Sequence, residues 1–303
     1  SSRRVWVTIR ETLVLLCIAI GLTPAFKMKF WNIGAEGQIL MGGMATAALM
    51  IYAGDAMPNW LLLILIFIAS AAAGLIWGLI PAVFKAYFNT NETLFTLMLN
   101  YVAMQLVTFA IVFWENPSGS NTVGIINAAG QKGWFPSIFG NMYGLNVIVV
   151  LIITLGMYVY MKYSKQGYEI AVVGESQNTA RYAGINVKKV IIRTMMLSGA
   201  ICGIAGCLIV SGASHTISTS TAGGRGFTAI IVAWMSKFNP FAMILVSAFL
   251  VFMQQGSIQI ASQFGLNENA SDIITGILLF FLIGCEFFIN YKLEWKKNHK
   301  EGK

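Results

Sequence analysis

Residues 60–84 read WLLLILIFIASAAAGLIWGLIPAVF and contain no charged side chain. A helix needs about 20 predominantly apolar residues to cross the hydrocarbon core of a bilayer, so this stretch predicts a membrane-spanning helix. The whole chain has the same character: 57% of its 303 residues are hydrophobic and only 11% are charged, whereas soluble domains carry about 25% charged residues. This apolar excess excludes a soluble enzyme, a disordered chain and a secreted disulfide-linked scaffold.

Charge-free runs predict an all-α, polytopic membrane protein with about eight membrane segments. The clear spans are residues 60–84, 93–114, 140–161, 194–211 and 241–261. Residues 273–291 form another span, interrupted only by Glu286. Residues 12–26 and 37–54 give weaker spans, and residues 227–236 are too short to cross alone. Two or three segments are therefore expected to be broken or re-entrant. We also expect an N-terminal helix to be missing upstream of Ser1.

Lysine and arginine concentrate in residues 162–193 and in the tail, residues 292–303. Cytoplasmic loops are enriched in these residues, so both segments and the C-terminus are expected in the cytoplasm. A transmembrane domain over residues 1–291 then carries a cytoplasmic loop at 163–190 and an external loop at 115–139, and a basic tail at 292–303 follows it. The net charge of +8 reflects this topology and does not imply a nucleic-acid partner.

Motifs for catalysis are missing from the sequence. It contains no phosphate-binding G-x-x-x-x-G-K-[ST] loop, no H-E-x-x-H, no G-x-S-x-G and no Cys/His metal pattern. We therefore predict no catalytic residue, no metal site and no cofactor in this chain. The remaining interpretation is a protein that forms a pathway through the membrane and takes its energy from elsewhere.

Two polar stretches interrupt the apolar pattern near its start. Residues 31–38, WNIGAEGQ, place Asn32 as a helix N-cap and Glu36 in the first helical turn. Such a glycine-rich helix start is typical of the discontinuous helices that build transport sites, although a capped turn without a ligand has the same pattern. Asn100 lies inside the span at 93–114, where its amide needs a partner. It either joins helices or faces the pathway.

A third polar stretch, residues 211–227, is rich in Gly, Ser and Thr and precedes the half-length apolar segment. Irregular backbone at membrane depth survives where protein or water satisfies it, so a loop that lines a cavity is expected here. Arg225 is expected to pair with Glu36, Asp272 or Glu286, or to contact substrate.

A fourth stretch lies in the basic loop. Ser176 or Asn178 can start a helix of about two turns, and Gly184 can end it. The small and aromatic residues of this stretch favour docking into a groove of a partner protein over a solvated linker.

Five motifs occur in order along the chain: residues 32–38 (NIGAEGQ), 98–101 (MLNY), 174–184, 198–206 and 223–228. Together they resemble the permease subunits of bacterial ABC importers in the ribose/branched-chain amino acid permease superfamily, over residues 11–285. The first motif is similar to the nucleoside-importing branch, whose receptors are lipoproteins of the basic-membrane-protein type. A simple-sugar importer of the ribose or galactose type, or less favoured an ATP-independent carrier, is the alternative.

The resemblance implies a multi-pass subunit in a bacterial plasma membrane. Its expected partners are a double-cassette ATPase that holds ATP and Mg²⁺, a second, related permease, an extracellular substrate-binding lipoprotein and the lipid bilayer. Residues expected to line the substrate pathway are Asn32, Glu36, Gln38, Asn100, Arg225 and Phe227. The residues implied in coupling to the ATPase are Glu175, Asn178, Ala180, Arg181, Tyr182, Ala183 and Gly184.

Overall fold

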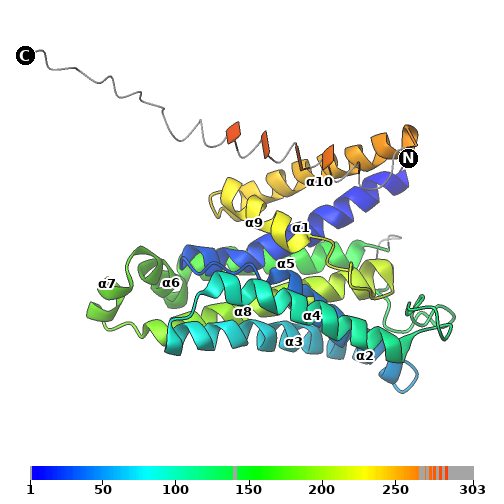
Figure 1. Ribbon diagram of the computed structural model, residues 1–303, viewed down its shortest axis with the longest axis horizontal. Coiled ribbons are helices and arrows are strands. Elements are labelled where there is room, and N and C mark those ends of the chain that lie inside the picture. Colours follow the sequence, from blue (N-terminus) through cyan, green and yellow to red (C-terminus); the bar gives the residue numbers. More distant parts are fainter. Residues whose placement is uncertain are drawn as a thin grey trace, which may run out of the picture. The chain divides into compact units, whose positions relative to one another are not determined.

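A computed structural model describes residues 2–138, 142–265 and scattered residues between 270 and 285. The expected span at 273–291 falls largely outside the described residues, and the tail at 292–303 lies wholly outside them. The regular elements of the described part are helices, which confirms the all-α prediction (Figure 1). They are α1 (Ser2–Lys27), α2 (Ala35–Ala53), α3 (Asn59–Phe88), α4 (Glu92–Trp114), α5 (Gly144–Tyr163), α6 (Lys165–Glu175), α7 (Gln177–Tyr182), α8 (Val187–Ile209), the π-helix η1 (Val210–Ser214), α9 (Arg225–Met235) and α10 (Pro240–Gln263).

Six helices of the described chain are long and apolar enough to cross a membrane: α1, α3, α4, α5, α8 with η1, and α10. Helix α2 has 19 residues but starts with a polar turn, and α9 has only 11. At 1.5 Å per residue α9 is about 16 Å long, roughly half the thickness of the hydrocarbon core. The segment at 227–236 is therefore a half-length helix, as its sequence predicts.

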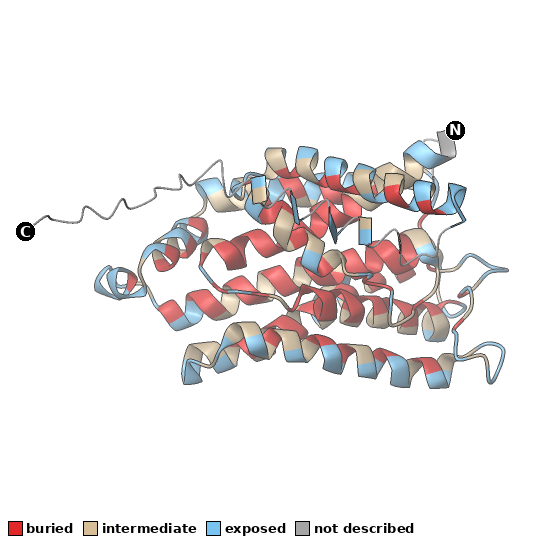
Figure 2. Ribbon diagram, turned by 45° about the horizontal axis from the view of Figure 1, so that its top comes forward, coloured by how far each residue is buried: buried red, intermediate tan, exposed pale blue. Residues whose placement is uncertain are grey.

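Helix α8 forms the centre of the first of two compact units, residues 1–248 (Figure 2). In its membrane window 78% of the residues are buried, against 22–28% in α3, α4 and α5. Glycines allow its neighbours to approach closely. A Cβ on Gly74 of α3 would overlap the carbonyl oxygen of Gly199 on α8, and one on Gly42 of α2 would overlap the backbone of Gly203. Small residues of this kind let membrane helices pack backbone to backbone.

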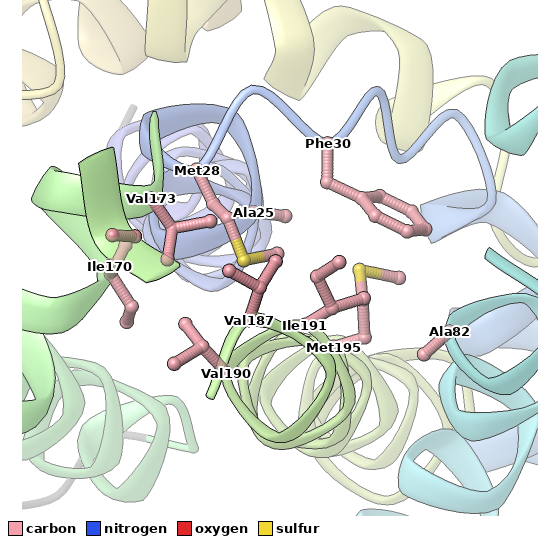
Figure 3. Packing of buried hydrophobic residues seen from close by; sticks show 11 residues of the cluster. Ala25, Met28, Phe30, Ala82, Ile170, Val173, Val187, Val190, Ile191 and Met195 are labelled. Atoms are coloured by element: carbon pink, nitrogen blue, oxygen red, sulfur yellow. The ribbon is translucent and has the colours of Figure 1, made fainter. Parts of the chain in front are cut away.

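The end of this unit where three lysines line one cavity is called the basic end here. Lys27, Lys162 and Lys237 surround a single cavity there. Helices α6 and α7 pack at the same end through an apolar cluster that includes Met28, Ile170 and Ala180 (Figure 3). The sequence analysis did not predict α6. Its signals were the N-cap Ser164, which accepts a hydrogen bond from the Gly167 N–H at 2.9 Å, and the spacing of its buried apolar residues.

The loop at 115–138 covers the opposite end of the same unit. The Asn127 side chain donates to the carbonyl of Met50, at the end of α2, at 2.7 Å. The Ile126 N–H donates to the carbonyl of His215 at 2.8 Å, and the His215 ring stacks on that of Trp134 with a centroid distance of 3.7 Å. These contacts fasten the loop to the helix ends.

Candidate functional site

Two helices that begin inside the helical unit meet at their N-termini. Residues 28–34 form an irregular lead into α2, and the irregular stretch 215–224 leads into α9. Gly226, in the first turn of α9, packs against the first turn of α2 so closely that a Cβ there would lie 2.6 Å from the Glu36 backbone nitrogen. Only glycine fits this approach without a shift of one helix. The two polar stretches of the sequence analysis are thus brought to one place.

Glu36 connects the two helix starts. Its buried carboxylate accepts hydrogen bonds from the Gly224 N–H at 2.6 Å and from the Gly226 N–H at 2.8 Å. The first N–H groups of a helix have no partner within the helix, and the helix dipole favours an anion beside them. A side chain of α2 therefore supplies the N-terminal cap of α9.

Arg225 forms its ion pair with Glu11 of α1 and not with Glu36, one of the three carboxylates expected as its partner. The Arg225 guanidinium lies 2.7 Å from the Glu11 carboxylate through Nη2 and 3.1 Å through Nε. Glu36 is already occupied by the backbone of α9, and Asp272 and Glu286 lie outside the described residues. Sequence analysis missed Glu11, although a carboxylate directly before an apolar run signals the need for a partner.

Buried amides hold the lead into α2. The Asn32 Oδ1 accepts the Gly34 N–H at 3.0 Å, and its Nδ2 donates to Ser198 of α8 at 3.3 Å and to Gln38 at 3.4 Å. The expectation that Asn32 is the N-cap of α2 is wrong, because the helix starts at Ala35 and Gly34 takes the cap position. Asn32 instead closes the turn just before the helix.

Asn100 joins α4 to the same lead. Its Nδ2 donates to the Ile33 carbonyl at 3.0 Å, and its Oδ1 accepts the Gly37 N–H at 2.9 Å. Thr96, one turn earlier on α4, accepts the Ile33 N–H at 3.2 Å. Of the two roles expected for Asn100, helix joining is the one these contacts show. Unsatisfied backbone groups are costly at membrane depth, so α4 supplies what the irregular lead lacks.

Aromatic rings form the accessible surface beside this junction. Phe227 and Trp234 are 43% and 41% exposed and lie seven residues apart on α9, which places them on one face. Trp31, 47% exposed, stacks on Trp234 with ring centroids 5.5 Å apart. Sequence analysis selected Phe227 and missed both tryptophans. The signal for Trp31 was its place directly before Asn32.

Helix α7 carries the residues expected in coupling. Ser176 is its N-cap, accepting the Thr179 N–H at 3.3 Å, and Gly184 ends it with a φ of +75°. Ala180 is fully buried against the rest of the chain, whereas Tyr182 is 91% exposed. Five further residues of the coupling set are also exposed in and around α7: Glu175, Asn178, Arg181, Ala183 and Gly184. Ala180 therefore anchors the helix, and its neighbours face outward.

The family model described as "Branched-chain amino acid transport system / permease component" matches residues 7–283 of this chain. The chain belongs to this family. As an ABC transporter permease it is a translocation component and not an enzyme, and it works in a complex with ATPase and substrate-binding partners. Its family and the six apolar helices found among the described residues make it a multi-pass membrane protein.

Characterised relatives cover most of the permease. The guanosine ABC transporter permease protein NupP of Bacillus subtilis is 30% identical over 91% of this chain and 79% of its own length. The nucleoside ABC transporter permease protein NupB of Lactococcus lactis is 26% identical over 97% of this chain and 82% of its own length. The glucose ABC transporter permease protein TsgB13 of Haloferax volcanii is 28% identical over 93% of this chain and 76% of its own length. No solved structure shows a significant match.

Proposed function

We propose that this permease translocates nucleosides across a bacterial plasma membrane, as a subunit of an ATP-driven importer. The observation that carries the proposal is the chemistry at the junction of α2 and α9. Glu36 is satisfied by backbone N–H groups and Arg225 by Glu11, so neither charge is left without a partner. The large side chains exposed on α9 and in the lead into α2 include the rings of Trp31, Phe227 and Trp234.

A neutral surface of aromatic rings suits a neutral, aromatic substrate. Rings stack favourably on nucleobases, and base–aromatic stacking contributes about 1–3 kcal/mol per base in nucleic-acid complexes. A charged substrate would need an unpaired partner of opposite charge, which these residues do not supply. Relatives named as guanosine and nucleoside permeases support the same substrate class.

A simple-sugar substrate is the second candidate, favoured by the relative named as a glucose permease. Aromatic rings also pack on the apolar faces of sugars, so the junction accepts either class. The polar pathway residues Asn32, Gln38 and Asn100 are buried and hydrogen-bonded to each other or to the backbone. In this proposal they hold the shape of the pathway, and the rings contact the substrate.

The remaining subunits follow from the same proposal. A double-cassette ATPase binds the exposed face of α7 and carries ATP and Mg²⁺, a second related permease completes the pathway, and an extracellular lipoprotein delivers the substrate. The basic end and the C-terminus face the cytoplasm, as the positive-inside rule requires for the lysines gathered there.

The test is uptake by the reconstituted importer. Proteoliposomes that contain both permeases and the ATPase, supplied with the receptor, should accumulate labelled guanosine, adenosine or uridine in an ATP-dependent manner. Ribose, galactose and glucose serve as competitors. The substitution Trp234→Ala should reduce uptake, whereas Trp60→Ala, at an even more exposed tryptophan at the start of α3, should not. ATP-dependent accumulation of a sugar alone would replace the nucleoside proposal by the sugar one.

A further inference from the structure

A groove of about 500 Å³ opens at the basic end between α1, α5 and the turn that joins α9 to α10. Its rim carries three lysines, one from each of these elements: Lys27, Lys162 and Lys237. No acidic residue lines it, and none of the three amines takes part in an ion pair among the described residues. The rim is therefore a concentration of uncompensated positive charge.

Apolar side chains of α1 and α5 form part of the wall of the groove. Helix α1 contributes Ile20, seven residues before Lys27 and on the same face, and α5 contributes Met157 and Met161. At 1.5 Å per residue, Ile20 lies about 10 Å deeper in the membrane than Lys27. The groove thus combines a cationic rim with an apolar wall that extends toward the membrane interior.

The turn between α9 and α10 is strained in order to form this groove. Lys237 and Phe238 have φ angles of +49° and +60°, a conformation that ordinarily favours glycine. Residues held in this region of backbone space persist where the surrounding structure fixes them, and they cluster at functional sites. Lys237 and Phe238 both line the groove, at positions where glycine would remove the backbone strain.

Lys162 is held at the rim by aromatic neighbours. Its ammonium group donates to the Tyr158 hydroxyl at 3.0 Å and lies 5.3 Å from the centre of that ring. The Tyr158 ring in turn packs edge to face on Phe241, at the start of α10, with centroids 5.2 Å apart. This chain of contacts links the rim to both sides of the groove.

We propose that this groove binds one anionic phospholipid, whose phosphate lies among the three lysine amines and whose acyl chain follows the apolar wall. Basic pockets between membrane helices at the cytoplasmic side bind anionic headgroups through such an arrangement. The lipid bridges α1, α5 and the α9–α10 turn, and so holds the inner end of the half-length helix. This inference does not depend on which substrate the permease carries.

The experiment measures lipid retention by the full-length permease in phosphatidylcholine nanodiscs that contain a minority of palmitoyl-oleoyl-phosphatidylglycerol. Native mass spectrometry of the released protein should show phosphatidylglycerol enriched about a hundredfold relative to phosphatidylcholine, since each of the three lysines near an anionic headgroup contributes roughly a factor of five. The triple variant K27Q/K162Q/K237Q should lose this enrichment.

The matched control is K165Q/K188Q/K189Q, which removes the same charge from exposed lysines at the same end of the molecule. It should keep the enrichment. Equal loss in both triple variants, or no enrichment in the unmodified chain, would overturn the proposal. Displacement of the lipid by millimolar inorganic phosphate would also overturn it, in favour of a free-anion site. The single variant K162Q, at an exposed position, should lower the enrichment about fivefold and serves if the triple variant does not fold.

Discussion

Gly226 of α9 donates its backbone N–H to the carboxylate of Glu36 on α2, at 2.8 Å, across 190 residues of sequence. The contact exists because glycine at 226 lets the two helix starts approach to van der Waals distance. The junction of the two helices therefore rests on one small residue and one carboxylate.

Replacing Gly226 by alanine should separate α9 from α2 and strongly reduce uptake. The added Cβ would lie 2.6 Å from the Glu36 nitrogen, and overpacking of this kind costs about 1–3 kcal/mol. Thermal unfolding in detergent and uptake in proteoliposomes check the prediction. Gly156→Ala on α5 is the control, because a Cβ there meets nothing within 4 Å. Equal uptake by the two variants would contradict the packing argument.

Replacing Glu36 by glutamine should lower stability by about 1–3 kcal/mol, because a single amide oxygen replaces the two carboxylate oxygens that accept the N–H groups of Gly224 and Gly226. The control is Glu115→Gln. The carboxylate of Glu115 also accepts two backbone N–H groups, from Gly119 and Asn121, but in an exposed loop. Water can replace these bonds, so the control should change the unfolding temperature little. A larger fall in unfolding temperature for Glu115→Gln than for Glu36→Gln would contradict the role of Glu36 in capping α9.

The substitution Asn100→Leu should reduce uptake while leaving assembly with the ATPase intact. It removes the partners of the Ile33 carbonyl and the Gly37 N–H, two backbone groups far from α7. Each orphaned buried group costs about 1–3 kcal/mol. Gln105→Leu, an exposed amide on the same helix, is the matched control and should transport normally. Co-purification of the ATPase measures assembly, and initial uptake rates measure transport. Normal uptake by Asn100→Leu would contradict the role given to this residue.

Tyr182→Ala should uncouple ATP hydrolysis from uptake without loss of folding. The side chain is 91% exposed on α7, so little packing is lost with it. Tyr163→Ala is the control, at a tyrosine that is 68% exposed at the end of α5. Substrate-stimulated ATPase activity of the assembled complex is the measurement. Full stimulation in Tyr182→Ala would show that the partner does not use this face of α7.

The contact between the loop at 115–138 and His215 should become less stable as the pH is lowered. Burial, together with the positive charge of Arg10, lowers the pKa of His215 below its ordinary value. A group whose pKa is lowered by folding adds stability above its unfolded pKa, and this stability is lost as the pH falls through the folded pKa. The unfolding temperature of the permease should therefore fall as the pH is lowered past the ordinary pKa of histidine. The variant His215→Phe keeps a ring to stack on Trp134, and its unfolding temperature should depend less on pH. An unchanged profile in that variant would assign the decline to other groups.

Local sequence signals predicted most helix positions well. Ser176, one of the two residues expected to start α7, is its N-cap, and its side chain accepts one of the first N–H groups of the helix. Charge-free runs located the spans because a bilayer requires continuous apolar length. The start of α1 was placed late, since Arg10 and Glu11 end the apolar run although the helix continues through them.

The sequence by itself therefore determined the fold class, most of the helices and the two places where the helical pattern breaks. Only the tertiary structure decided which groups meet at those breaks. Arg225 pairs with Glu11 across 214 residues, whereas Glu36, the expected partner, binds the backbone of α9. Hydrophobic periodicity shows which residues must leave water, but it carries no information about which distant segment will supply a hydrogen bond. The partner depends on how closely the helices can pack. At this junction α9 reaches Glu36 because Gly226 has no side chain to hold the two helix starts apart.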